Sequence, residues 1–275
     1  MIVVTGATGN IGGPLVRALA DAGEQVVAVS RTAAEVPDGV THATADLTDA
    51  TTLAPVLAGA DALFLLLADP RLDPALLADT AVRAGVRRIV LLSSQGAGTR
   101  SESPSHGWFL AAEKAVLDTP AAVTVLRPGG FASNAYQWAA SVRADRTVAA
   151  PYGDVSLPVV DPDDIAAVAA TVLRSDDHAG RTYVLTGPAP ISPRQQAAAL
   201  GAALGEPVGF SELSRADARA AMLAFMPGPI ADTTLDVLGH PSAEERQVSP
   251  DVEALLRRAP GSFAGWAARN ADAFR

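Results

Sequence analysis

Short apolar runs alternate with longer helical patterns through the first 130 residues of the chain. The apolar runs cover residues 2–5, 25–29, 61–68, 87–94 and 122–128, with a weaker run at 41–45. Unbroken runs of Val, Ile and Leu are typical of parallel strands that are covered on both faces. After the first run, apolar positions at helical spacing predict a helix over residues 10–22 that ends at Gly23. The alternation predicts an α/β fold built on a doubly wound parallel sheet.

The pattern loosens after residue 130. Residues 161–173 predict a helix, and residues 181–187 predict a late strand that returns to the sheet. Several predicted helices begin with a capping side chain followed by proline, which suits the first helical position. These pairs are Asp73-Pro74, Asp161-Pro162, Ser192-Pro193 and Ser249-Pro250. We expect a sheet domain over residues 1–150, rejoined by residues 161–187, and a smaller, mainly helical cap over residues 188–275.

Composition and charge disfavour several classes of function. The 275-residue chain is 49% hydrophobic, so it can bury a full core. Its net charge is −9 and it has no long basic run, which disfavours binding to nucleic acid or to an anionic membrane surface. It contains no cysteine, so disulfides and thiolate chemistry are excluded. With no secretion signal, and no apolar run near the ~18 residues that a membrane span needs, we expect a cytoplasmic protein.

A glycine-rich turn directly follows the first predicted strand. In "TGATGNIGG" the residues Gly6, Gly9 and Gly12 have the spacing G-x-x-G-x-x-G. Such glycines permit a tight turn, a close approach of the backbone to a pyrophosphate, and close packing of helix on strand. The N–H groups at the start of the following helix then face the phosphates. This context predicts a dinucleotide site; the alternative is a turn with a purely structural role.

The end of the second predicted strand carries Arg31, with Ser30 beside it, where an NAD-binding domain places an acidic residue. A guanidinium binds a 2′-phosphate through paired hydrogen bonds, so Arg31 predicts NADP(H). A solvated surface arginine is the alternative. After the third predicted strand, "ADLTD" offers Asp46 for the adenine edge and Leu47 for covering the ring. A helix cap is an equally good interpretation of Asp46.

Together, "TGATGNIG", Arg31, "ADLTD", "HGWFLAAEKAV" and "TVLRPGGFASN" resemble the NmrA-like branch of the atypical short-chain dehydrogenases/reductases. Within that branch the chain looks most like the NADPH-dependent quinone oxidoreductase type. The likeness is firmest over residues 1–135 and thin beyond residue 190. The resemblance implies a Rossmann core that binds NADP(H), with a substrate cleft between this core and the cap.

The resemblance also assigns roles to individual residues. It places Lys114 near the nicotinamide ribose, Ser93 beside the nicotinamide ring, and residues 128–131 along the cleft wall. Lys114 and Ser93 are thus the candidate catalytic residues. The predicted substrate pocket is formed by Phe131, Asn134 and Tyr136. The predicted cofactor-binding set is Gly6, Thr8, Gly9, Asn10, Ile11, Gly12, Arg31, Asp46, Leu47, Leu66, Ser93, Lys114 and Pro128.

These side chains also have structural alternatives. Lys114 is interpreted either as the cofactor contact or as a solvated lysine, and Ser93 either as a cofactor contact or as a partner for backbone groups at a strand end. Asn134 either lines the cleft or caps a helix, and His106 is either a proton donor or a structural histidine. The acidic run at 161–164 is interpreted as a helix cap. No pattern of histidines and carboxylates predicts a metal site.

Typical reductases of this superfamily carry a tyrosine one helical turn before the lysine, but here that position is Leu110. Reduction of a plain ketone needs a proton donor for the developing alkoxide. A reduced quinone is instead a delocalised anion, for which a cation such as Lys114 and water suffice. We therefore expect an NADPH-dependent reductase of a quinone or a similar conjugated carbonyl.

Two other hypotheses stay open beside this one. The first is a non-catalytic regulatory protein that senses NADP(H). The second is a tailoring reductase or isomerase that acts on an aromatic metabolite. The expected partner in the enzymatic cases is a small-molecule substrate, and the sequence leaves a homodimer open.

Overall fold

A seven-stranded parallel sheet forms the centre of the computed structural model, which describes residues 1–67 and 69–275. The strand order is β3-β2-β1-β4-β5-β6-β8. The strands are β1 (Ile2–Thr5), β2 (Val26–Ser30), β3 (Thr41–Thr44), β4 (Ala62–Leu66), β5 (Arg88–Leu92), β6 (Ala122–Pro128) and β8 (Thr182–Leu185). This order confirms the predicted doubly wound Rossmann sheet. The predicted strand over 61–68 ends at residue 66, and residue 68 lies outside the described residues.

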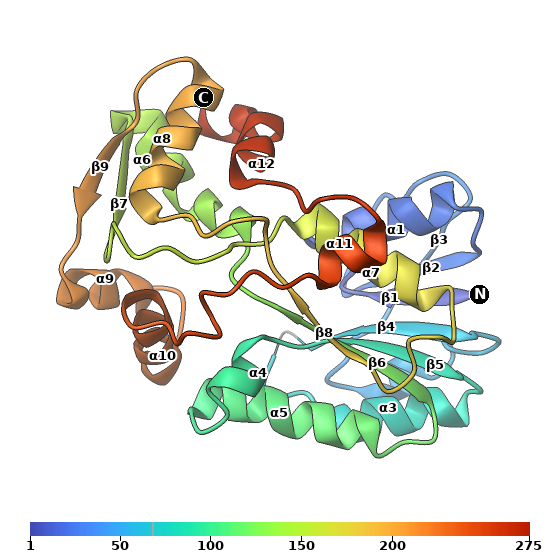
Figure 1. Ribbon diagram of the computed structural model, residues 1–275. Helices are drawn as coiled ribbons and strands as arrows, with labels where there is room; N and C mark the ends of the chain where they lie inside the picture. The colour runs from blue at the N-terminus through green and yellow to red at the C-terminus, as the bar shows by residue number, and fades with distance from the viewer. Residues whose placement is uncertain (68) are drawn as a thin grey trace.

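Two helical layers cover the sheet, and its side chains alternate between them. Ile2 and Val4 belong to the apolar cluster that includes α1 and α7, while Val3 belongs to the cluster beneath α2, α3 and α5. The first layer consists of α1 (Gly12–Asp21), α7 (Pro162–Leu173) and α11 (Asp251–Leu256). The second layer (Figure 1) consists of α2 (Ala50–Leu53), α3 (Pro74–Arg83), α4 (Gly96–Thr99) and α5 (Pro104–Leu117). Burial on both faces explains why the strands are unbroken apolar runs.

A separate cap lies beyond the carboxyl ends of the strands (Figure 1). It contains a small parallel sheet in which β7 pairs with β9. The cap elements are η1 (Ala132–Trp138), α6 (Ala139–Asp145), β7 (Thr147–Ala150), α8 (Pro193–Leu204), β9 (Gly209–Glu212), α9 (Arg215–Met222), α10 (Gly228–Gly239), α12 (Phe263–Arg269) and η2 (Ala271–Phe274). Parallel sheets bind ligands in the crevice outside the carboxyl ends of their strands, which here faces the cap.

The chain passes between core and cap more than once. After β7 in the cap, α7 packs on the core and β8 pairs with β6, which confirms the late strand predicted over 181–187. Much later, α11 returns to the core, where Val252 joins the apolar cluster of α1 and α7. The division into residues 1–150 and 188–275 stays a prediction. In the structure β7, within residues 1–150, belongs to the cap, and α11, within residues 188–275, packs on the core.

Polar side chains begin the helices where the sequence predicts. Asp73, Asp161 and Ser192 cap α3, α7 and α8, respectively. Helix α11 differs from the prediction: it begins at Asp251, so Pro250 is its N-cap and not its first helical residue, and the Asp251 N–H donates to the Ser249 hydroxyl at 3.2 Å. The Asp251 carboxylate also accepts the N–H of Val184 at 2.8 Å, which satisfies part of the open edge of β8.

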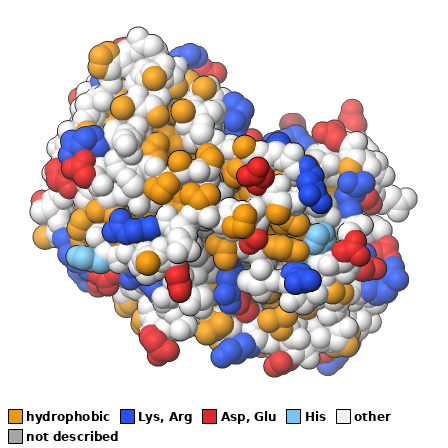
Figure 2. Space-filling view, in the orientation of Figure 1, with side chains coloured by type: hydrophobic (Ala, Val, Ile, Leu, Met, Phe, Trp, Pro, Cys, Tyr) orange, Lys and Arg blue, Asp and Glu red, His pale blue; other side chains and the backbone are white. Residues whose placement is uncertain are grey.

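Charges of both signs are interspersed on the face of the molecule drawn in Figure 2. Many are paired across the cap surface, as Arg194 is with Asp154 at 2.9 Å and Arg219 with Asp232 at 2.7 Å. Exposed pairs of this kind contribute little to stability, typically ~0–1 kcal/mol. Within the described part of the chain, no helix has both the length and the apolar composition that crossing a bilayer requires.

Candidate cofactor-binding and active site

The glycine turn joins β1 to α1 through very close backbone contacts. Gly6 has φ +65°, in the left-handed region that favours glycine. Its carbonyl oxygen accepts the N–H of Gly9 at 3.0 Å. A Cβ on Gly12 would stand 2.7 Å from the carbonyl carbon of Gly6 and even closer to its oxygen. The turn therefore has the tight bend and the close helix packing that the sequence predicts.

Four backbone N–H groups at this turn have no hydrogen-bond acceptor among the described residues. They belong to Thr8, Asn10, Ile11 and Gly12. Thr8, Gly9 and Asn10 are exposed, and the four groups lie at or just before the start of α1. The helix dipole favours an anion at this end. Free donors, exposure and dipole together fit the diphosphate of a dinucleotide.

Neighbouring elements hold the turn in place. Leu66, at the end of β4, packs on Gly6, where an added Cβ would lie 2.6 Å from the Leu66 Cδ2 atom. The buried hydroxyl of Thr5 donates to a β4 carbonyl and accepts the N–H of Leu66, both at 2.9 Å. The Asn10 amide donates to the Ser133 hydroxyl at 3.5 Å, which links the turn to η1. The structure thus brings Leu66 and Ser133 to the turn, and the cofactor-binding roles of Leu66 and Asn10 stay predictions.

Arg31 is exposed directly after β2, at the carboxyl edge of the sheet. The hydroxyl of Ser30 is engaged by the backbone of Thr32 at 2.7 Å and by the ring of His42 at 2.8 Å. Ser30 is therefore fixed within the protein, whereas Arg31 extends from it with its guanidinium at the surface. This placement suits a contact with a ribose phosphate.

Asp46 and Leu47 lie in the turn after β3. The Asp46 carboxylate accepts the N–H of Thr48 at 3.0 Å, and this bond is the main reason that the pKa of Asp46 lies below its ordinary value of 3.8. The following helix, α2, is capped by Asp49, so Asp46 stabilises the preceding turn and does not cap the helix. Leu47 is half-buried against the cluster beneath α2 and α3.

Sequence reasoning missed an ion pair near this edge. Arg71 forks onto Asp69 just after β4, with its Nε atom 3.0 Å from both carboxylate oxygens. These hydrogen bonds, together with the N–H of Arg71, lower the pKa of Asp69 to about 2. Arg31 contributes to the field at Asp69 and at Asp46, so the two arginines lie in one electrostatic neighbourhood. No periodic pattern indicates this pair, because both residues lie in a loop.

Ser93 is placed in the interior, directly after β5. It is 7% exposed, and its hydroxyl donates to Glu113 Oε1 at 2.5 Å. Glu113, on α5, is itself 2% exposed and also accepts Arg127 of β6 through two hydrogen bonds, at 2.9 and 2.6 Å. A serine has one proton, so in this arrangement Ser93 has none left to donate to a substrate. Its neighbour Ser94 is half-buried and accepts the N–H of Gly96 at 3.2 Å.

The α5 helix presents His106, Leu110 and Lys114 along one side, four residues apart. Lys114 is exposed, and Leu110 occupies the position where typical relatives carry the tyrosine. Glu113 is the helix residue that sequence reasoning passed over. An acidic residue on a surface helix normally faces water, so only the partnership with Arg127 reveals its burial.

His106 is held as a hydrogen-bond donor to Ser103. The Ser103 hydroxyl donates to the carbonyl of Arg100 at 2.9 Å, so the 3.1 Å contact with His106 Nδ1 places the proton on that nitrogen. Burial is the main cause that lowers the pKa of His106 below 6.5, and Arg100 lowers it further, against the opposite effect of Glu245. The lowered pKa favours the uncharged ring, and a proton on Nδ1 leaves Nε2 as an acceptor.

The predicted cleft wall follows β6. Pro128 is buried, and its carbonyl accepts the N–H of Gln95 at 2.9 Å. Phe131 is half-buried against the sheet cluster that includes Val160. Asn134 is exposed within η1.

Tyr136 lies farther into the cap than the other predicted pocket residues. It packs edge-on against Trp266, with ring centroids 5.0 Å apart, and stacks on Phe274 at 5.9 Å. Its hydroxyl donates to Asn270 at 2.5 Å. Phe131 packs on the sheet cluster, whereas Tyr136 packs on Trp266 and Phe274 of the cap, and their common role in a substrate pocket stays a prediction.

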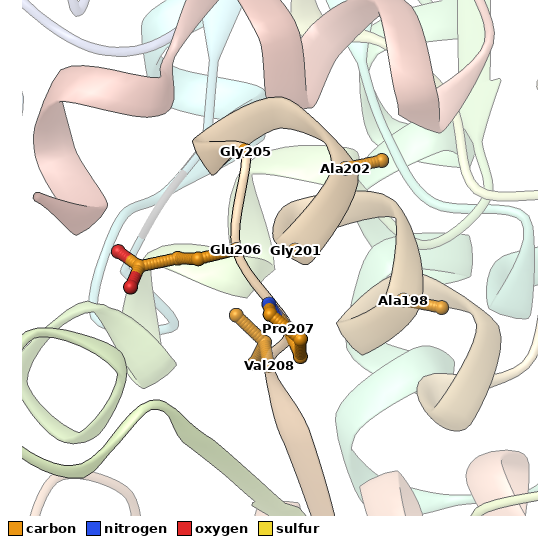
Figure 3. A pocket seen from close by; sticks show the side chains of 7 residues that line it. All are labelled: Ala198, Gly201, Ala202, Gly205, Glu206, Pro207 and Val208. Atoms are coloured by element: carbon orange, nitrogen blue, oxygen red, sulfur yellow. The ribbon is translucent and has the colours of Figure 1, made fainter.

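A hollow of about 400 Å³ is lined by Gln95, Thr99 and Arg127 and by residues of the segment 244–250. Arg127 is the partner of the buried Glu113 carboxylate. Another hollow, of about 430 Å³, lies at the end of α8 in the cap (Figure 3). Ala198 and Ala202 point away from Glu206 there, and the lining offers small apolar side chains. It is remote from the glycine turn in the core, so we do not assign the chemistry to it. In the described residues, no group of three or more His, Asp or Glu side chains is arranged for a metal ion.

Comparisons with known proteins agree with this geometry. Residues 6–176 match the family described as NAD(P)H-binding. The chain is 37% identical to the (4-alkanoyl-5-oxo-2,5-dihydrofuran-3-yl)methyl phosphate reductase of Streptomyces griseus, and the match covers 100% of this chain and 99% of that protein. It is 32% identical to the NAD(P)H azoreductase of Xenophilus azovorans, again over 100% and 99%.

The chain belongs to the NAD(P)H-binding family. The crystal structure of an NADPH-dependent quinone oxidoreductase from Escherichia coli, complexed with NADPH, superposes with a TM-score of 0.81 at 26% identity, over 98% of this chain and 99% of that one. The predictions of a nicotinamide cofactor and of an NmrA-like oxidoreductase of the quinone oxidoreductase type are thereby confirmed. The family match does not specify the electron acceptor.

Proposed function

We propose that this oxidoreductase transfers a hydride from NADPH to a quinone or a similar conjugated carbonyl. The observation that carries the proposal is that the protein groups around the candidate site are poorly suited to donate a proton. Leu110 stands at the tyrosine position, the Ser93 hydroxyl donates its hydrogen bond to Glu113, and burial lowers the pKa of His106, whose Nδ1 lies 3.1 Å from the Ser103 hydroxyl. An acceptor that becomes a delocalised anion needs no protein acid, because water protonates it afterwards.

The relatives support the same chemical class. The names of the reductases from Streptomyces griseus and Xenophilus azovorans and of the Escherichia coli enzyme denote an unsaturated lactone ester, an azo group and a quinone. Each is a conjugated acceptor whose reduction places charge on an electronegative atom. We infer that the present chain acts on a member of this class.

Each part of the cofactor has its own binding residues in this proposal. The free N–H groups at Thr8, Asn10, Ile11 and Gly12 bind the diphosphate, and Arg31 binds the 2′-phosphate that distinguishes NADPH. Lys114 holds the ribose hydroxyls and places a positive charge near the reduced acceptor. When bound, the cofactor supplies the hydride.

A panel of acceptors tests the proposal. Purified protein is mixed with NADPH and a quinone, an enone, an azo dye or a plain ketone, and the loss of NADPH absorbance is followed. We expect turnover with at least one conjugated acceptor and none with the plain ketone. Tight binding of NADPH without turnover of any acceptor would overturn the proposal and favour the regulatory hypothesis.

A further inference from the structure

The carboxylate of Glu113 connects three elements at the carboxyl edge of the sheet. It accepts Ser93, which follows β5, at 2.5 Å and Arg127 of β6 at 2.9 and 2.6 Å, and it is carried by α5. The side chains of Glu113 and Arg127 are 3% and 22% exposed, so the pair is largely shielded from water. No other residue in the described part of the chain bridges these three elements through a single carboxylate.

A gain in stability does not by itself explain why Glu113 and Arg127 form a buried ion pair. A buried ion pair loses much of its attraction to desolvation, and well-packed apolar residues of similar volume are often as stabilising. What the pair provides in addition is orientation, since the planar guanidinium and the carboxylate meet through two parallel hydrogen bonds. The third bond, from Ser93, then fixes the hydroxyl rotamer at the end of β5.

The neighbouring residue on α5 is Lys114. Because a helix is rigid over one turn, anchoring Glu113 to β5 and β6 also fixes the rotation and height of the backbone that carries Lys114. Functional groups must be held to within ~0.5 Å of their productive positions, and locked neighbouring side chains provide this precision. Resting on the proposed function, we propose that Glu113 is a positioning residue: it accepts the hydrogen bond of the Ser93 hydroxyl, leaving that oxygen only as an acceptor toward other groups, and it sets the place of Lys114.

Glu113→Gln tests the proposal, because the amide has the same shape but cannot accept both arms of Arg127. In the folded variant we expect kcat for a conjugated acceptor to fall by about tenfold or more, with the Kd for NADPH changed by less than about threefold, since the turn that binds the diphosphate is untouched. The double variant S93A/E113Q should be no slower than E113Q, because the two residues act as one unit. Glu113→Asp should recover part of kcat.

The control is Asp164→Asn, which removes another buried carboxylate with an arginine partner. Asp164 accepts Arg258 at 2.7 Å and the N–H of Gly261 at 2.6 Å, both from the segment after α11. We expect this variant to lose stability while keeping kcat. If E113Q merely lowers the unfolding midpoint to the same extent and keeps kcat below that temperature, the role is structural and the positioning proposal is overturned.

A second readout needs no catalysis. The Ser93→Ala and Glu113→Ala changes, each of which removes the hydrogen bond, form a double-mutant cycle in the unfolding free energy of the protein without cofactor, and we expect them to be non-additive. Additive effects would show that the hydrogen bond between Ser93 and Glu113 is not formed, and would also overturn the proposal. An inactive wild type with intact coupling in this cycle would instead count against the proposed function alone.

Discussion

Gly12 leaves no room for a side chain over Gly6. An added Cβ would stand 2.7 Å from the carbonyl carbon of Gly6 and 2.8 Å from the Cα atom of Ala7. Since these are backbone atoms, Gly12→Ala must push α1 away from the turn. We expect the variant to lose about 1–3 kcal/mol of stability through overpacking. The Kd for NADPH, measured by calorimetry, should rise by about tenfold or more, because the backbone N–H groups of the turn would no longer point at the diphosphate.

Gly13→Ala is the matched control for this prediction. A Cβ on Gly13 would meet the Ala7 carbonyl oxygen at 3.7 Å, an ordinary contact, and Gly13 lies within α1. Alanine stabilises a helix interior by up to about 1 kcal/mol relative to glycine. We expect unchanged or improved stability and normal NADPH binding. Equal effects of the two changes would contradict a steric origin at Gly12.

Arg31→Ala is expected to change cofactor preference. Hydrogen bonds to a charged group contribute about 1.5–3 kcal/mol, so the Kd for NADPH should rise by about one to two decades. The Kd for NADH should change little, because NADH has no 2′-phosphate. Arg83→Ala, which removes an exposed arginine paired with Asp79 on α3, serves as a control for the loss of surface charge. Equal weakening of both cofactors would refute the assignment of Arg31.

Lys114→Ala is expected to reduce turnover more than binding. Removing one preorganised group at a developing negative charge typically lowers kcat by about 10²–10³-fold. The Kd for NADPH should rise only modestly, because the diphosphate and 2′-phosphate contacts remain. Steady-state kinetics with a conjugated acceptor and separate binding measurements distinguish the two effects. A variant with full kcat would leave Lys114 as a solvated lysine.

The fold was predictable because its strands are buried on both faces. Unbroken apolar runs such as Leu63–Leu65 in β4 have few alternatives once glycine and proline mark their ends. The glycine turn was predictable for a related reason: the residue type required at Gly6 and Gly12 is dictated by backbone geometry. These features are local in sequence, so a single chain displays them.

The interior of the candidate site was not predictable, because it depends on partners far apart in the chain. Three separate parts of the chain supply Ser93, Glu113 and Arg127, and the sequence around each residue does not indicate that they share hydrogen bonds. The packing of the Tyr136 ring on Phe274, at the far end of the chain, could likewise not be seen from its place after the Pro-Gly-Gly turn, and its role in a substrate pocket stays a prediction. Tertiary packing, not local pattern, decides where such side chains go.

The buried carboxylate of Glu245 makes the stability of the link between cap and core depend on pH. Glu245 is 3% exposed and accepts Arg100 of the loop after α4 at 2.7 and 2.8 Å, as well as Thr99 at 2.8 Å and the N–H of Ser242 at 2.8 Å. Burial alone raises the pKa of Glu245, but these hydrogen bonds outweigh it, and the pKa lies below its ordinary value of 4.5.

A carboxyl whose pKa is lower in the folded than in the unfolded chain contributes stability above the unfolded value, and this contribution disappears as the pH falls through the folded value. We therefore expect Glu245→Gln to destabilise the protein at pH 7 and the difference from wild type to shrink progressively below about pH 4.5. Chemical unfolding of both proteins across this range measures the difference. Asp79→Asn, at an exposed pair, should show little change at any pH. If the difference in unfolding free energy between Glu245→Gln and wild type stays constant down to pH 3, the negative charge of Glu245 is not what holds the segment after α10 to Arg100.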